Sequence, residues 1–137
     1  VKRRYHVAGG AGQRGYTPFG IETAKGASRS DLKEFWHVGR DLPAGHRFAD
    51  IMAPNLWPDS DLPQFRPALQ ALFAALEGAG RRVLRAIAVH LGQMADFFDS
   101  PVADGNSILR LLHYPPVPAE ADAVRAGAHE DINVITL

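Results

Sequence analysis

The chain of 137 residues has no cysteine, no net charge and no long hydrophobic run. Without cysteine it forms no disulfide, zinc–thiolate site, iron–sulfur cluster or thiol nucleophile. A net charge of zero gives no overall field that would favour nucleic acid or an anionic membrane. No apolar stretch approaches the length that crosses a bilayer, and no signal peptide is visible. We therefore expect a cytoplasmic protein with no nucleic-acid or membrane partner.

The composition is that of an ordinary folded domain. Hydrophobic residues make up 46% of the chain and charged residues 22%, which is typical of globular proteins. The length is enough for one domain with a core. The chain begins at Val1 without an initiator Met and stops at Leu137 within an apolar run. We therefore expect it to be a piece of a longer protein.

A glycine-rich stretch near the start contains the spacing G-x-G-x-x-G at Gly10, Gly12 and Gly15. That pattern binds a dinucleotide only when it follows a buried strand and opens a helix. Here little hydrophobic sequence precedes it, and a segment containing Pro18 and Gly20 follows. We interpret it as a mobile loop.

The clearest predicted element is a long helix over residues 63–91. Its apolar residues keep one helical phase, and alanines fill much of the remainder. Pro63 starts the segment and Gly92 is expected to end it. The apolar residues in phase are Leu69, Leu72, Phe73, Leu76, Val83, Leu84, Ile87 and Leu91.

Shorter elements surround this helix. Residues 31–39 favour a strand, although a helix start is also compatible with them. A short helix over about 94–98 follows the long one, and residues 107–114 and 127–137 are expected to be strands. Helix and strands in this order predict an α+β fold with an unfinished sheet.

The last predicted strand carries the sequence His129-Glu130-Asp131. In an extended segment, side chains two residues apart point to the same face, so His129 and Asp131 would lie side by side. An imidazole and a carboxylate make two-thirds of the facial triad that holds iron(II) in non-haem oxygenases. A pair at the end of a strand with a purely structural role would leave the same short pattern.

Several segments together resemble one family. In their order along the chain they match the isopenicillin N synthase-like branch of the non-haem iron(II), 2-oxoglutarate-dependent oxygenases. The matching pieces are Gly15-Tyr16, Asp31-Leu32-Lys33-Glu34, Asn55-Leu56-Trp57-Pro58 with Phe65-Arg66-Pro67, Leu109-Arg110-Leu111-Leu112-His113-Tyr114-Pro115, and His129-Glu130-Asp131 with Ile135-Thr136-Leu137.

The resemblance implies a double-stranded β-helix, or jelly roll, with helices packed on its outside. Residues 1–105 would form the N-terminal loop and helix region, with 63–91 as the supporting helix. Residues 106–137 would begin the jelly roll, which needs about eight strands. The chain holds too few strands to complete it.

The resemblance also implies site residues. His129 and Asp131 fall on the first two metal ligands, and Tyr114 falls on a tyrosine that donates a hydrogen bond to a carboxylate. The family's second metal-binding His, and its Arg with a Ser or Thr for the 2-oxoglutarate tail, would lie beyond Leu137. Within the chain, His113 is the nearest candidate for a third ligand. Arg110 is expected to be a structural ion-pair partner.

The implied cofactors are Fe(II) and 2-oxoglutarate as cosubstrate, with O2. The implied reaction oxidises a small organic substrate and releases succinate and CO2. One alternative is an oxidase of the isopenicillin N synthase type, which uses O2 without 2-oxoglutarate. Another is a non-catalytic helical module in which His129 and Asp131 have no metal. The substrate and the oligomeric state cannot be read from the sequence.

Overall fold

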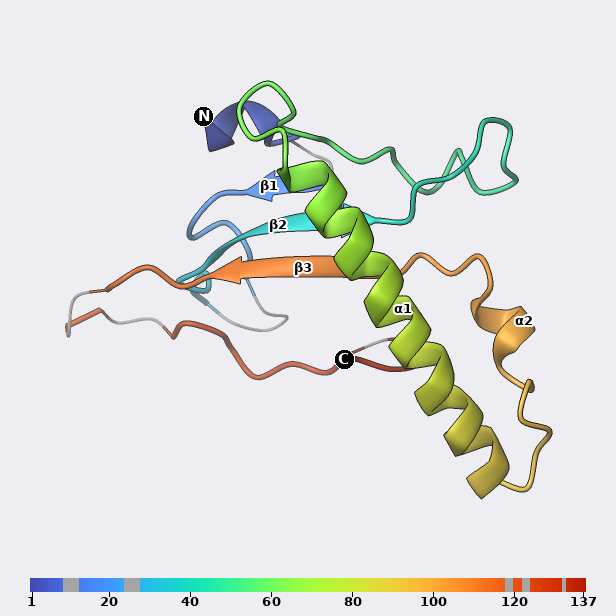
Figure 1. Cartoon of the computed structure of the whole chain (residues 1–137). Helices are drawn as coiled ribbons and strands as arrows, with labels where there is room; N and C mark the ends of the chain where they lie inside the picture. The colour runs from blue at the N-terminus through green and yellow to red at the C-terminus, as the bar shows by residue number, and fades with distance from the viewer. Residues whose placement is uncertain (9–12, 24–27, 118–119, 122–123, 132) are drawn as a thin grey trace.

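The computed structural model describes residues 1–8, 13–23, 28–117, 120–121, 124–131 and 133–137. Figure 1 shows a long helix crossing the strands of a small sheet. This combination confirms the expected α+β class. Along the chain the elements are η1 (Lys2–Tyr5), β1 (Gly15–Thr17), β2 (Glu34–Gly39), α1 (Phe65–His90), α2 (Asp99–Val102) and β3 (Ile108–His113).

The three strands form one antiparallel sheet in the order β1-β2-β3, so β2 is central. Trp36 of β2 lies opposite Tyr16 of β1 and Leu111 of β3. Because side chains alternate along a strand, Trp36 and Val38 face one side of the sheet and Phe35 faces the other. All three are buried, so β2 is covered on both faces. The strands expected over 31–39 and 107–114 are thereby confirmed.

The helix expected over 63–91 is α1, and the backbone conformation of Gly92 determines where it ends. Gly92 has a φ of 71°, the left-handed conformation that glycine adopts without strain. The N–H of Gln93 donates to the carbonyl of Ala88 at 2.9 Å, and the N–H of Gly92 donates to that of Val89 at 3.0 Å. These two bonds form a Schellman motif, which satisfies carbonyls that the helix leaves unpaired.

The buried side of α1 is narrower than its apolar pattern predicts. Leu69, Gly80, Leu84 and Ala88 are the buried residues of the helix. The helix has 26 residues, about 39 Å at roughly 1.5 Å per residue, whereas the centres of three strands span only roughly 10 Å. The sheet therefore covers only part of the helix. Four residues of the predicted apolar face are exposed instead: Leu72, Val83, Ile87 and Leu91.

Aromatic rings join α1 to the sheet. The ring of Trp36 lies 5.2 Å from that of Phe65 at the start of α1 and 5.4 Å from that of Tyr5 in η1. Trp57 packs edge-on against Phe65 at 6.5 Å. Trp36 thus forms a single core with the helix, the N-terminal turn and the connection before α1.

Two residues of the family pattern hold the loops against this core. The side-chain amide of Asn55 both donates to the carbonyl of Gly39 and accepts from its N–H, each at 2.8 Å. Gly15 has a φ of 73°, and a Cβ there would lie 2.6 Å from the carbonyl oxygen of Tyr5. Only glycine fits that position.

Gly15 also decides how the glycine-rich stretch is interpreted. Gly10 and Gly12 lie outside the described residues. Gly15 begins β1, so the stretch leads into a strand, whereas a dinucleotide loop leads into a helix. The strand at Gly15 agrees with the sequence interpretation on this point, and the absence of a dinucleotide site stays a prediction.

The expected final strand over 127–137 is wrong. Residues 127–131 and 133–137, the described part of that segment, form no strand. A strand needs a neighbour for its ladder of hydrogen bonds, and the end of the segment turns to α1 instead. A Cβ placed on Gly80 would lie 3.4 Å from Cδ1 of Leu137, so Leu137 lies against the helix.

The short helix is displaced from its expected position. It was predicted over about 94–98, and the structure has turns there, followed by α2 at Asp99–Val102. Asp99 and Pro101 belong to a first helical turn, where a carboxylate is favoured and a missing N–H is tolerated.

None of the helices in the described part of the chain combines the length and the apolar character needed to cross a membrane. Because β3 pairs with β2, the sheet joins the two regions expected at 1–105 and 106–137. That division into two regions stays a prediction.

Candidate functional site

A polar network covers the face of the sheet opposite α1. Alternation along the strands places Phe35 and His37 of β2 on this face beside Arg110 of β3. Nε of Arg110 donates to Nε2 of His37 at 2.6 Å, and its guanidinium lies 4.7 Å from the ring centre of Phe35. The His37 side chain is buried. Because the guanidinium is the donor, Nε2 of His37 accepts this hydrogen bond and carries no proton.

Glu22 links this pair to a second cation. One carboxylate oxygen lies 3.2 Å from Nη2 of Arg110, and the other lies 2.7 Å from Nζ of Lys33. Lys33 in turn lies 2.8 Å from Oδ2 of Asp31. The charges alternate from Arg110 through Glu22 and Lys33 to Asp31, which confirms the ion-pair role expected for Arg110.

Asp31 and Lys33 are almost fully buried, at 3% and 4% exposure. Burial alone would raise the pKa of Asp31, but hydrogen bonds from Lys33 and from the Gly127 N–H outweigh it, and the pKa lies below its ordinary value. Burial would likewise lower the pKa of Lys33, but Asp31 and Glu22 outweigh it and raise that pKa. Both groups are therefore ionised at neutral pH.

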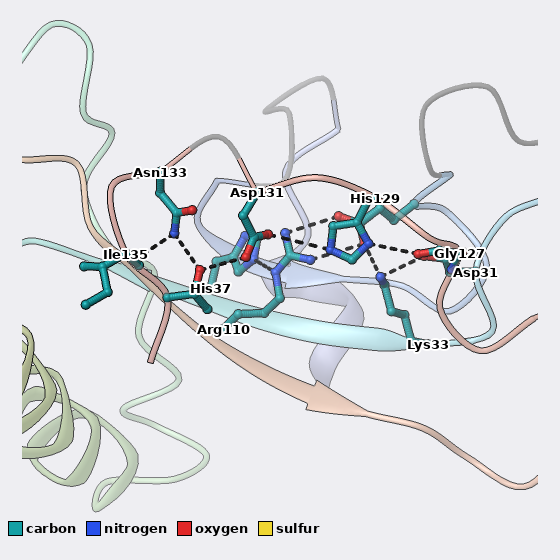
Figure 2. A network of polar contacts seen from close by, with 11 residues as sticks. Asp31, Lys33, His37, Arg110, Gly127, His129, Asp131, Asn133 and Ile135 are labelled. Atoms are coloured by element: carbon teal, nitrogen blue, oxygen red, sulfur yellow. Dashed lines mark hydrogen bonds and ion pairs between the residues drawn. The ribbon is translucent and has the colours of Figure 1, made fainter.

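His129 and Asp131 lie side by side above this network, as Figure 2 shows. Nε2 of His129 is 3.8 Å from Oδ1 of Asp131, and each side chain is 55% exposed. Nδ1 of His129 lies 2.9 Å from the carbonyl oxygen of Gly127. A carbonyl only accepts, so Nδ1 donates its proton to Gly127, and Nε2 is the nitrogen turned toward the carboxylate.

The far oxygen of Asp131 is held by its own segment. Oγ1 of Thr136 donates to Oδ2 of Asp131 at 2.7 Å. The side-chain amide of Asn133 donates to Oγ1 of Thr136 at 2.9 Å and to the carbonyl of Ile135 at 3.0 Å. Oδ1 of Asp131 is left on the side of His129.

These two side chains fit part of an iron(II) shell. The donor types are an imidazole with its Nε2 directed outward and a carboxylate with one oxygen turned to the same side, as the facial triad requires. Among the described residues no group of three or more His, Asp or Glu side chains could hold a metal. The described residues therefore offer a candidate ligand pair without a third ligand, and metal binding by the pair stays a prediction.

Tyr114 follows β3 directly and is half-buried. Continuing the alternation of β3 by one residue puts it on the face of Arg110 and Leu112, the face with the polar network. The predicted hydrogen bond from Tyr114 to a carboxylate is compatible with that face and stays a prediction.

His113, the nearest candidate for a third ligand, belongs to a different cluster. It lies opposite Glu34 in the sheet, and its Nδ1 is 2.7 Å from the Glu34 carboxylate. Lys2 and the hydroxyl of Tyr16 also donate to Glu34. Alternation places this cluster on the α1 side, away from His129. His113 is therefore not a ligand partner of the pair.

The Glu34 cluster shifts two pKa values. Burial alone would raise the pKa of Glu34, but hydrogen bonds from Lys2, Tyr16 and His113 outweigh it and lower the pKa to about 2. Burial, followed by the Glu34 carboxylate, raises the pKa of Tyr16 to about 12. The carboxylate and the phenol therefore both keep their ordinary neutral-pH forms in the fold.

Sequence reasoning gave no role to Glu22, Lys33, Asp31 or His37. A signal was present in the even spacings between Asp31, Lys33 and His37, two and four residues, which put them on one face of an extended segment. The partner of Asp31 near the C-terminal end of the chain, Gly127, was not visible, because it lies 96 residues from Asp31.

A protein-family model matches residues 1–60 and describes the N-terminal region of non-haem dioxygenases, "non-haem dioxygenase in morphine synthesis N-terminal". The curated relatives include the 2-oxoglutarate-dependent dioxygenase caaD of Aspergillus niger, 33% identical over 91% of this chain and 39% of its own length. They also include the 2-oxoglutarate-dependent dioxygenase citB of Monascus ruber, 34% identical over 92% of this chain and 42% of its own length.

Solved structures are similar in fold and sequence. A 2OG-Fe(II) oxygenase family protein from Caulobacter crescentus is 56% identical with a TM-score of 0.82, over 96% of this chain and 42% of that one. A full-length Neurospora crassa protein, solved in complex with alpha-KG, is 35% identical with a TM-score of 0.74, over 95% of this chain and 42% of that one.

The chain thus belongs to the non-haem iron(II), 2-oxoglutarate-dependent oxygenases, as the sequence resemblance implied. It spans about two-fifths of the length of the relatives it matches.

Proposed function

We propose that this chain is the N-terminal part of an Fe(II), 2-oxoglutarate-dependent oxygenase that uses O2 to oxidise a small organic molecule. The observation that carries the proposal is the pairing of His129 Nε2 with Asp131 Oδ1 at 3.8 Å. The relatives named for Fe(II) and 2-oxoglutarate support it, because they match the chain over nine-tenths of its length or more.

His129 and Asp131 would hold the iron, which when bound supplies the activation of O2 for attack on a C–H bond. Two protein ligands from this chain and one from elsewhere would leave open positions for the keto acid and O2. Tyr114 would donate its phenolic proton in a hydrogen bond to a carboxylate of 2-oxoglutarate, a short charge-assisted bond. The buried ring of Phe35 on β2 would exclude water beneath the site.

The rest of the site would come from further sequence. The relatives extend well beyond the matched region, since the chain covers only 39–42% of the first of them. We propose that the complete protein adds a second metal-binding His, an Arg with a Ser or Thr for 2-oxoglutarate, and the remaining strands of the jelly roll.

The isopenicillin N synthase-like branch remains the finer proposal. The alternative function is an oxidase of the isopenicillin N synthase type. In that case the carboxylate beside Tyr114 would belong to the substrate, and no 2-oxoglutarate would be consumed. The names of the relatives favour the 2-oxoglutarate user. The similar Neurospora crassa protein has been solved with thymine and with 5-formyluracil, which supports a small molecule as the substrate class. The cytoplasmic location, the absence of nucleic-acid and membrane partners and the division at 105/106 stay predictions.

The test uses the complete protein with Fe(II), 2-oxoglutarate and O2. We expect succinate to form in the presence of Fe(II), and we expect its formation to stop when the metal is chelated. Oxidation of a substrate with no succinate formed would support the oxidase instead. Absence of Fe(II) binding by the complete protein, or a coding sequence with no further His and no Arg-x-Ser or Arg-x-Thr after Leu137, would reject the oxygenase.

A further inference from the structure

The segment that carries His129 and Asp131 is attached to the sheet at few points in the part of the chain that the structure describes. It forms no strand there, so no ladder of hydrogen bonds holds it. Two backbone N–H groups make the attachments: Leu32 donates to the carbonyl of Val124 at 3.0 Å, and Gly127 donates to Oδ1 of Asp31 at 3.0 Å. The second lies only two residues before His129.

The surroundings of Asp31 fix its carboxylate as the acceptor for the N–H of Gly127. Its carboxylate is 3% exposed, and its two oxygens have separate partners, with Oδ1 bonded to Gly127 and Oδ2 to Lys33. Lys33 is itself bound by Glu22 at 2.7 Å. A buried carboxylate without such a cation would be strongly unfavourable. The cation makes a fixed anionic acceptor at this depth possible.

Gly127 passes this constraint to His129. Its N–H is bonded to Asp31, and its carbonyl accepts from Nδ1 of His129 at 2.9 Å. The same residue therefore joins the buried carboxylate to the imidazole. The bond at Nδ1 fixes the ring so that Nε2 is the nitrogen directed toward Asp131. Figure 2 shows these residues in one connected line.

We propose that Asp31, supported by Lys33 and Glu22, is a positioning residue for the candidate metal ligands His129 and Asp131. It acts by gripping the backbone of Gly127, whose carbonyl orients the imidazole, and it does not touch the metal or the substrate. This inference rests on the proposed function, because it assumes that the pair binds a divalent metal. Groups that orient a metal ligand in this way typically contribute about ten- to a hundredfold to metal affinity.

The first test needs no substitution. In the metal-free complete protein, we expect the amide hydrogen of Gly127 to exchange slowly, and ¹⁵N shifts of the His129 ring to show a proton on Nδ1. Rapid exchange at Gly127, or a ring protonated at Nε2 alone, would overturn the proposal whether or not any variant folds.

The second test compares two variants of the complete protein, Asp31→Asn and Asp61→Asn. Asp61 is a matched control because it also accepts side-chain hydrogen bonds, from Arg4 and Tyr5, but far along the chain from the ligand segment. Mn(II) affinity is measured by calorimetry, and Co(II) absorption reports the coordination geometry. We expect Asp31→Asn to weaken Mn(II) binding about ten- to a hundredfold and to change the Co(II) spectrum. Asp61→Asn should keep both at the wild-type values.

The outcomes separate this inference from the proposed function. If wild-type protein binds Mn(II) and His129→Ala loses it, while Asp31→Asn is less stable but binds as wild type, Asp31 is merely structural and the inference fails alone. If wild-type protein does not bind Mn(II), Co(II) or Fe(II), the proposed function fails first.

Discussion

The side-chain amide of Asn55 pairs with the backbone of Gly39 through two hydrogen bonds of 2.8 Å. The amide does for the end of β2 what a neighbouring strand does elsewhere, since it supplies one donor and one acceptor to the same residue. It thereby ties the long connection before α1 to the central strand.

Asn55→Ala should therefore destabilise the protein by about 1–3 kcal/mol, because both groups of Gly39 lose their partner. Asn55→Asp keeps the acceptor and loses the donor, and we expect an intermediate effect. Urea unfolding at neutral pH measures both. As a control, Asn133→Ala removes an exposed amide whose hydrogen bonds to described residues stay within its own segment, and a loss as large as that of Asn55→Ala would contradict this account.

The uneven burial of α1 predicts different effects for two leucines on one helix. Leu84 is 5% exposed and Leu72 is 44% exposed. Leu84→Ala should lower the free energy of unfolding by about 2–5 kcal/mol, because it leaves a cavity in the core. Leu72→Ala should change it by no more than about 0.5 kcal/mol. Equal effects in denaturant titrations would show that α1 is rotated about its axis and turns a different face toward the core.

Glu34 should make stability depend on acid pH. Its pKa is about 2 in the fold against 4.5 ordinarily, so the unfolded chain binds more protons in that interval. The stabilisation by Glu34 is therefore complete above about pH 4.5 and is lost as the pH falls toward about 2.

Glu34→Gln should cost about 1–3 kcal/mol at pH 7, and the difference from wild type should shrink as the pH falls below about 4.5. Unfolding by urea across this pH range gives both quantities. Glu120→Gln, at an exposed position, is the control and should leave the pH dependence unchanged. A constant difference at all pH values would mean that the Glu34 carboxylate has an ordinary pKa.

His129 and Asp131 should be essential for turnover and nearly neutral for folding. Both side chains are 55% exposed, so replacing either by Ala removes little packing. In the complete protein we expect His129→Ala and Asp131→Ala to abolish succinate formation while circular dichroism and the unfolding midpoint stay close to wild type. Glu130→Ala, at the exposed residue between them, should retain activity. Normal turnover in Asp131→Ala would count heavily against the metal assignment.

Local patterns in the sequence were enough to predict α1, β2 and β3. The helical phase of Leu69 and Leu84 and the branched and aromatic residues around Trp36 are properties of neighbouring residues. The final strand was predicted by the same reasoning and is absent from residues 127–131 and 133–137. An apolar run becomes a strand only beside a partner, and that partner is a tertiary property.

The proximity of His129 and Asp131 followed from spacing alone, although the reason given for it, a regular strand, was wrong. The attachment of Gly127 to Asp31 could not be predicted in this way, because no periodicity links residues so far apart. The family resemblance pointed to Asp31 and Lys33 as matching residues without saying what they touch. Only the packed structure brings the buried carboxylate under the imidazole segment.

The position of β3 at the outside of the sheet has a practical consequence for work with these 137 residues by themselves. The backbone groups on its outer edge pair with no further strand in the part of the chain that the structure describes. An unpaired strand edge of this kind is a template for pairing with a second molecule. Sedimentation velocity should show self-association that grows with concentration, and adding Lys at Leu109 or Leu111 would be the wrong remedy because both pack on the core. Charge placed at Ile108 or Leu112, which are exposed, should keep the isolated piece dispersed.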